Sequence, residues 1–121
     1  MKSKGRHITL DYCGFKGDGD WMLSVLRAAV SRSAAREVHA HVEQFDGIQS
    51  PLGFAAVVLI DESHVSAHCY EEEGILALDC FTCGGVDPAG IADDIHQQLV
   101  DAIPAIKLVQ RNEIDRFVME G

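Results

Sequence analysis

A short polar stretch at residues 62–64, Glu-Ser-His, places a carboxylate, a hydroxyl and an imidazole in consecutive positions. A second imidazole, His68, follows Ser63 by five residues, and a thiol, Cys83, follows it by twenty. A hydroxyl can act as a nucleophile, an imidazole is the usual general base near neutral pH, and a thiol can donate a proton. These residues can therefore supply nucleophilic and acid–base chemistry if the fold brings them together.

Two strands joined by a tight turn are predicted to position these groups. From His64 to Tyr70 the apolar residues Val65, Ala67 and Cys69 alternate with polar or aromatic ones, and a period of two is typical of a half-buried strand. The nearly continuous apolar run 75–82 predicts a second strand. Residues 72–74, Glu-Glu-Gly, are short enough for a hairpin turn in which Gly74 takes a positive φ.

The register of this hairpin decides which side chains share a face. If paired residue numbers sum to 145, Cys83 lies opposite Glu62, and Asp79, His68 and Tyr70 project to the same side as Cys83. A slip of one residue would place Cys83 opposite the serine instead. We expect the first register, although both place a thiol across from the peptide bond between residues 62 and 63.

The same residues carry a resemblance to a known family. Glu-Ser-His at 62–64, His68, and the run Asp-x-Phe-Thr-Cys-Gly at 79–84 resemble the short prokaryotic type of S-adenosylmethionine decarboxylase proenzyme. The opening residues 1–7 and the total length are similar to that family as well. The resemblance therefore extends over most of the chain.

The resemblance implies that the chain cuts itself between Glu62 and Ser63. The Ser63 hydroxyl would attack the preceding carbonyl to form an ester, and loss of the serine α-proton would then expel the acyl group. Hydrolysis of the resulting dehydroalanine would leave a pyruvoyl group. The products would be residues 1–62 (the β chain) and 63–121 (the α chain, with an N-terminal pyruvoyl), and His68 is assigned to this processing step.

The resemblance also implies the reaction of the processed enzyme. The self-generated pyruvoyl cofactor would form a Schiff base with S-adenosylmethionine and withdraw electrons as CO₂ leaves, and Cys83 would donate the proton to the product. The product would be the aminopropyl donor for spermidine synthesis. Tyr70 would offer an aromatic face to the substrate and Glu72 a carboxylate to its ribose. No metal is expected.

Two positions differ from the usual family pattern and leave alternatives open. Gln49 stands where an aromatic residue usually precedes a proline, and Ala55 stands where a serine usually assists processing. One alternative keeps the pyruvoyl cofactor but changes the substrate to arginine or ornithine. Another is an unprocessed chain that serves as a regulatory or binding subunit.

A zinc or redox site is not favoured by Cys80 and Cys83, although they form a C-x-x-C pattern. On a regular strand these two positions point to opposite faces, and no second pair of ligands has suitable spacing. His39 and His41 share a face but have no third ligand. Cys80 is therefore expected to be a small core residue.

Composition narrows the class of protein. The chain has 121 residues, of which 47% are hydrophobic, and this predicts a single folded domain over residues 1–121. A net charge of −9 argues against nucleic-acid binding and favours a small cationic substrate of the amino-acid type. Free cysteines and the lack of a signal or long apolar segment predict a cytoplasmic protein without membrane contact. The family resemblance implies a homodimer of cleaved chain pairs.

The predicted element order is β-α-β-β-β-β-α-β. It indicates an α+β two-layer sandwich, with a mostly antiparallel sheet and two helices on one face. The expected strands cover residues 7–13, 38–45, 55–60, 64–72, 75–82 and 106–110, and the expected helices cover about 18–36 and 88–103. The tail from Arg111 is expected to add little to the fold.

Overall fold

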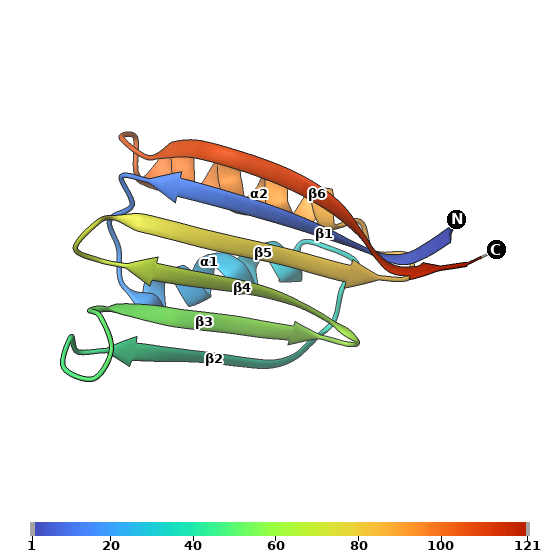
Figure 1. Ribbon diagram of the computed structural model, residues 1–121, viewed down its shortest axis with the longest axis horizontal. Coiled ribbons are helices and arrows are strands. Elements are labelled where there is room, and N and C mark those ends of the chain that lie inside the picture. Colours follow the sequence, from blue (N-terminus) through green and yellow to red (C-terminus); the bar gives the residue numbers. More distant parts are fainter. Residues whose placement is uncertain (1, 121) are drawn as a thin grey trace.

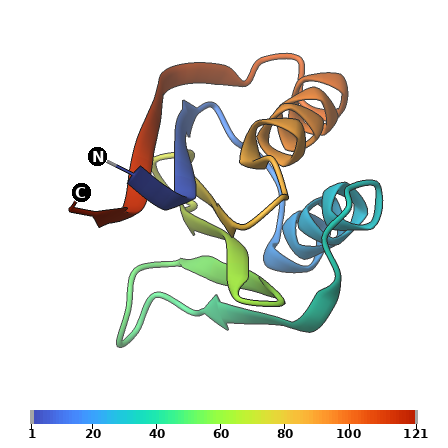
Figure 2. The same cartoon turned by 90° about the vertical axis from the view of Figure 1, so that its right-hand side faces the viewer.

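The computed structural model describes residues 2–120, which form one six-stranded sheet with two helices on a single face (Figures 1 and 2). In chain order the elements are β1 (Lys2–Cys13), α1 (Gly19–Ser31), β2 (Glu37–Phe45), β3 (Gly53–Ile60), β4 (Ser63–Tyr70), β5 (Ile75–Cys83), α2 (Pro88–Ala102) and β6 (Lys107–Met119). The strands lie in the order β2-β3-β4-β5-β1-β6, and all neighbours are antiparallel. The predicted α+β two-layer architecture is confirmed.

The central hairpin has the predicted register. His64 pairs with Phe81 and His68 pairs with Ala77, so the paired numbers sum to 145, and Gly74 has a φ of 64°. We call the sheet surface opposite the helices the open face. From β4 and β5 it receives His64, Ser66, His68, Tyr70, Ala77, Asp79, Phe81 and Cys83, which alternate with the residues that enter the core.

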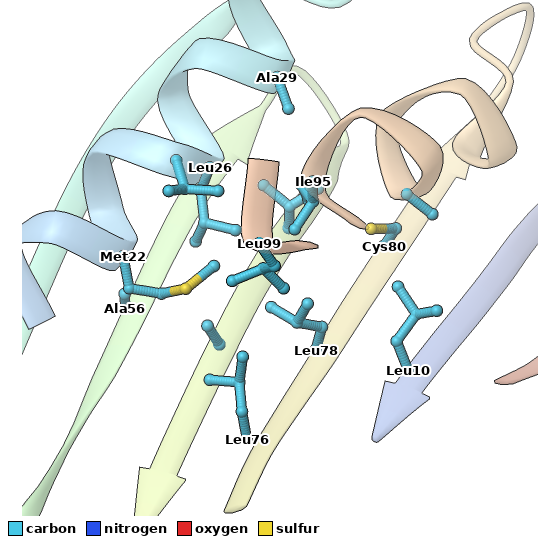
Figure 3. Packing of buried hydrophobic residues seen from close by; sticks show 14 of the residues in the cluster. Leu10, Met22, Leu26, Ala29, Ala56, Leu76, Leu78, Cys80, Ile95 and Leu99 are labelled. Carbon is cyan, nitrogen blue, oxygen red and sulfur yellow. The ribbon is translucent and has the colours of Figure 1, made fainter. Parts of the chain in front are cut away.

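The other sheet face forms the core with the two helices. Each helix begins within one residue of its expected start: the Asp18 side chain accepts from the Trp21 N–H at the start of α1, and the Asp87 side chain accepts from the Ala89 N–H at the start of α2. The packed residues shown in Figure 3 include Leu10, Met22, Leu26, Ala29, Ala56, Leu76, Leu78, Cys80, Ile95 and Leu99. Packing of the sheet against the two helices therefore holds strands β4 and β5 rigidly.

Strand β6 is much longer than predicted. It pairs with β1 over almost the full length of both strands, which also extends β1 back to Lys2. Its polar residues gave no strand periodicity, because β6 is an edge strand whose two faces are both largely solvated. On the helix side Arg111 pairs with Asp93, and Arg6 pairs with Glu113. The tail from Arg111 is thus a structural part of the sheet, and that prediction was wrong.

Two smaller differences concern α1 and β2. Helix α1 ends at Ser31, where the N–H of Arg32 closes the last turn onto Ala28. A register shift near the start of β2 leaves Val38 outside the regular pairing, with 54% of the residue exposed, although it begins the expected strand 38–45. Neither difference moves the central hairpin.

The cysteines of β5 point to opposite faces, as expected. Cys80 is fully buried, and burial raises the pKa of its thiol to about 12. Cys83 is half-buried at the open face. Cys80 therefore remains a neutral core thiol, separate from Cys83. Over residues 2–120, neither helix has the length and apolarity that a membrane crossing requires.

Candidate active site at the start of strand β4

The bond between Glu62 and Ser63 lies at the end of a tight hairpin turn. Ile60 of β3 pairs with Ser63 of β4, so only Asp61 and Glu62 connect the two strands. Asp61 has a φ of 52°, a conformation typical of two-residue hairpin turns. The Arg36 guanidinium donates to its carboxylate at 2.7 Å. The turn exposes Glu62 to solvent.

The structure brings Ser63 and Cys83 together. Ser63 is 7% exposed, and its Oγ accepts a hydrogen bond of 2.9 Å from the backbone N–H of Cys83. Because both strands are fixed against the core, this bond holds the hydroxyl beside the Glu62–Ser63 peptide. The Cys83 side chain projects to the open face next to this position.

A hydrogen-bonded chain of three side chains lies on the open face near Cys83. Asp79 Oδ1 lies 2.9 Å from His7 Nε2, and Arg116 Nη1 lies 3.1 Å from His7 Nδ1. A guanidinium can only donate, so Nδ1 is the acceptor and Nε2 carries the proton that is donated to Asp79. Asp79, which lies in an otherwise apolar strand, therefore has a defined hydrogen-bond partner in His7.

Aromatic rings surround this chain. The ring of Phe81 lies 5.4 Å from that of His64 and 5.9 Å from that of Phe117, measured between centroids. The Arg116 guanidinium lies 5.6 Å from the Phe81 centroid. Burial, and secondly the neighbouring His7, lower the pKa of His64, so its imidazole is uncharged at neutral pH. The surroundings of Cys83 are thus partly apolar.

His68 and Tyr70 lie toward the opposite end of β4. Five residues of strand separate His68 from Ser63, which corresponds to about 17 Å. His68 is exposed on the open face, opposite Ala77 on one side and Ala55 on the other. Glu72 is exposed in the turn that follows. One chain alone does not bring His68, Tyr70 or Glu72 to the serine.

A pocket of about 640 Å³ lies at the C-terminal end of β4, away from Ser63. His68 and Tyr70 line it together with Asp11, Phe45 and Pro51. Its walls are mainly apolar, and it is large enough for a small organic ligand. Gln49 lies outside it and lines a smaller hollow in the β2–β3 loop.

Sequence reasoning missed His7, Arg116 and Phe117 as residues of this site. His7 belongs to a recognisable opening segment, and its strand carries alternate polar residues, but neither feature indicates that it reaches Asp79. Arg116 and Phe117 lie in the tail that was predicted to add little. Phe117 has a φ of 52°, which is uncommon for a bulky residue and which no sequence pattern reveals.

Comparison with known proteins identifies the family of the chain. The family model described as S-adenosylmethionine decarboxylase matches residues 6–112. The chain is 36% identical over 112 residues to the S-adenosylmethionine decarboxylase proenzyme of Symbiobacterium thermophilum, covering 88% of this chain and 82% of that protein. It is 33% identical over 120 residues to the proenzyme of Thermoplasma acidophilum, covering 96% and 86%.

A solved structure has the same fold. The crystal structure of the adenosylmethionine decarboxylase from Aquifex aeolicus superposes with a TM-score of 0.74 at 28% identity, covering 99% of this chain and 96% of that one. The family model over most of the chain, the identity to these relatives and the shared fold lead to one conclusion: the chain belongs to the S-adenosylmethionine decarboxylase family.

Proposed function

We propose that this protein cleaves its own backbone between Glu62 and Ser63 and then decarboxylates S-adenosylmethionine to the aminopropyl donor of polyamine synthesis. The observation that carries the proposal is the position of Ser63. It is the first residue of a rigid strand, it follows a tight turn, and its hydroxyl is fixed by the Cys83 N–H. The proenzyme name of the relatives supports the same reaction.

The cleavage uses only the chain and water. Ser63 Oγ attacks the carbonyl carbon of Glu62, and the peptide nitrogen takes up a proton as the amide becomes an ester. Removal of the Ser63 α-proton then expels the Glu62 carboxylate. Water converts the remaining dehydroalanine to a pyruvoyl group and releases ammonia. Residues 1–62 and 63–121 remain associated, because β3 and β4 still pair along their length.

The surroundings of Ser63 fit a pyruvoyl group. A ketone at residue 63 supplies the electron sink for the loss of CO₂ from a bound amino acid. The Cys83 N–H is a donor on a rigid strand that can serve an oxygen at this position. The Cys83 thiol beside it can supply the proton for the product carbon, and the Phe81 ring, two residues away on the same face, lies against His64.

His68 acts in this proposal on the serine of a second subunit. About 17 Å separates the two residues within one chain, which is too far for proton transfer. The open face has no helix over it, and it carries exposed apolar side chains such as Tyr70, Ile75 and Ile114. A face-to-face homodimer, with its two-fold axis crossing β4 midway between residues 63 and 68, would bring His68 of each subunit to Ser63 of the other.

The same dimer would complete the substrate site. Tyr70 and Glu72 would contribute an aromatic face and a carboxylate for ribose hydroxyls to the partner's centre, because they lie beyond His68 on the same strand and turn. Ala55 pairs with His68, so the serine hydroxyl that the family resemblance implies for this position is absent next to the proposed processing base. We therefore expect slow cleavage.

Co-expression of two variants tests this arrangement. His68→Ala alone should remain uncut, because its serine has no base. When it is co-expressed with Ser63→Ala, the mixed dimer gives the His68→Ala chain an intact partner's His68, and that chain should be cleaved. The two chains carry different tags, and mass spectrometry identifies which one is cut. An uncut His68→Ala chain in purified mixed dimers would contradict action between subunits.

The substrate is tested by CO₂ release from S-adenosylmethionine, arginine and ornithine, compared side by side. We expect release from S-adenosylmethionine alone. Release of CO₂ from arginine or ornithine, and not from S-adenosylmethionine, would contradict the proposed substrate and identify that amino acid as the substrate. A chain that stays full length and releases no CO₂ would indicate a regulatory or binding subunit and would exclude the proposed function.

A further inference from the structure

We propose that Arg36 is a positioning residue for self-cleavage, because through the Asp61 carboxylate it holds the turn that carries the Glu62 carbonyl. This inference rests on the proposed function and names a residue that keeps one half of the reacting pair in place. It is carried by the ion pair between Arg36 and Asp61 and by the backbone conformation of the turn.

The two reacting groups of the cleavage are held very differently. Ser63 is nearly buried, and its hydroxyl accepts from the Cys83 N–H on a strand fixed against the core. Glu62 is exposed in the turn between β3 and β4, and its carbonyl is the group that the hydroxyl attacks. Attack requires the reacting atoms to lie within about 3–3.5 Å of each other in a defined direction. The conformation of the turn therefore decides how often the carbonyl is in reach.

Asp61 gives this turn a backbone conformation that is unfavourable for most side chains. Its φ is 52°, whereas Glu62, the second residue of the turn, is not among the residues with a positive φ. Hairpin turns with a positive φ only at the first of their two central residues usually carry glycine there. Aspartate tolerates this region better than most residues but lacks the freedom of glycine. A contact that holds Asp61 in place therefore favours the turn.

Arg36 supplies that contact. Its Nη2 donates to Asp61 Oδ1 at 2.7 Å, and its Nε donates to the same oxygen at 3.1 Å. Across residues 2–120, no other side-chain hydrogen bond or ion pair involves Asp61 or Glu62. The pair is exposed, so it adds little to the stability of the whole fold. The planar fork of the guanidinium nevertheless fixes the direction of the carboxylate, and its effect is local to the turn.

The start of β2 places Arg36 beside the turn. Arg36 directly precedes β2, whose first residue, Glu37, pairs with Ile60, the last residue of β3. Arg27 of α1 donates to the Glu37 carboxylate at 2.9 Å. The register shift between Glu37 and His39 is a bulge-like irregularity, and bulges redirect the side chains around them. Arg36 thus reaches the turn from a backbone that is anchored to both α1 and β3.

The rate of self-cleavage tests the inference. Newly synthesised chain is labelled in a cell-free system, and its conversion to two fragments is followed by denaturing electrophoresis. Arg36→Gln should slow the conversion by about twofold to fivefold, which is the effect of losing one exposed ion pair from the reactive conformation. The readout needs no substrate and precedes any decarboxylation.

Arg27→Gln is the matched control. It breaks an exposed ion pair of the same kind, with Glu37, which does not touch the turn. This variant should be cleaved at the wild-type rate. In uncut Ser63→Ala protein, Arg36→Gln and Arg27→Gln should lower the melting temperature by similarly small amounts. An equal slowing of cleavage in Arg27→Gln, or an unchanged rate in Arg36→Gln, would overturn the inference.

Asp61→Gly shows whether Arg36 acts through Asp61. Glycine adopts the positive φ without strain and offers no carboxylate to the guanidinium. Arg36→Gln should therefore not slow the Asp61→Gly chain any further. A further slowing equal to that seen with Asp61 present would overturn action through this carboxylate. If Asp61→Gly does not accumulate, Asp61→Ala takes its place in the same comparison.

Failure of the proposed function has a different signature. In that case the wild-type chain itself would remain uncut, or Ser63→Ala would be cut at the same bond, and this inference would fall with it. Wild-type and Arg36→Gln chains that are both cut before Ser63 at the same rate would overturn the inference alone.

Discussion

Replacing Ser63 by alanine is expected to leave a single uncut chain. The reaction needs a hydroxyl at this position, and no other group of the turn can replace it, since Glu62 already supplies the carbonyl that is attacked. The variant loses one hydrogen bond, from the Cys83 N–H, at a cost of about 1 kcal/mol, so it should still fold. Denaturing electrophoresis and intact mass should show one species of 13.2 kDa.

The control for this variant is Ser66→Ala. Ser66 is a nearly buried serine on the same strand, paired with Asp79 and not with Cys83. It should be cut as the wild type is, with only a small change in melting temperature. Two fragments from the Ser63→Ala chain, divided at the same bond, would show that the serine is not the nucleophile.

Replacing Cys83 by alanine is expected to leave cleavage intact and to reduce decarboxylation strongly. Cleavage depends on the backbone N–H of residue 83, which alanine retains, whereas turnover depends on the thiol proton. Loss of a positioned general acid typically costs about 10²-fold to 10⁴-fold. We therefore expect kcat to fall at least about 100-fold with a smaller change in KM. Progressive inactivation should accompany the residual turnover, because protons then also reach the protein's own ketone carbon.

Cys80→Ala is the matched control. Its thiol is three residues away on the same strand but points into the core. The variant should lower the melting temperature, since it leaves a small void, while the kcat of the folded fraction stays near the wild-type value. Full turnover by Cys83→Ala, measured as CO₂ release per cleaved chain, would contradict the acid role.

The central hairpin was predictable because its signals are local. Alternation along β4, the apolar run of β5 and the glycine at residue 74 together indicate a strand pair and limit its register to two choices one residue apart, of which the structure has the expected one. A single register then fixes that Asp79 and Cys83 share the open face with His68. The starts of both helices, Gly19 and Pro88, likewise lie within one residue of their expected positions.

The features that could not be predicted from the sequence depend on contacts between residues distant in sequence. Edge strand β6 is polar on both sides and has no periodicity, so its pairing with β1 has no local signal. The contact of His7 with Asp79, and of Arg116 with His7, arises only once β1 lies between β5 and β6. The separation of His68 from Ser63 follows from strand rise alone. The proposal of a site shared between two subunits also needed the open face, which only the fold reveals.

The central claim is that Ser63 becomes a ketone, and carbonyl labelling of the purified protein tests it most directly. We expect a hydrazide reagent to label only the fragment 63–121, and we expect this fragment to be lighter by one ammonia than the same residues with an intact serine. Borohydride should remove both the labelling and the release of CO₂. Protein that releases CO₂ from S-adenosylmethionine but carries no reactive carbonyl on this fragment would contradict the account.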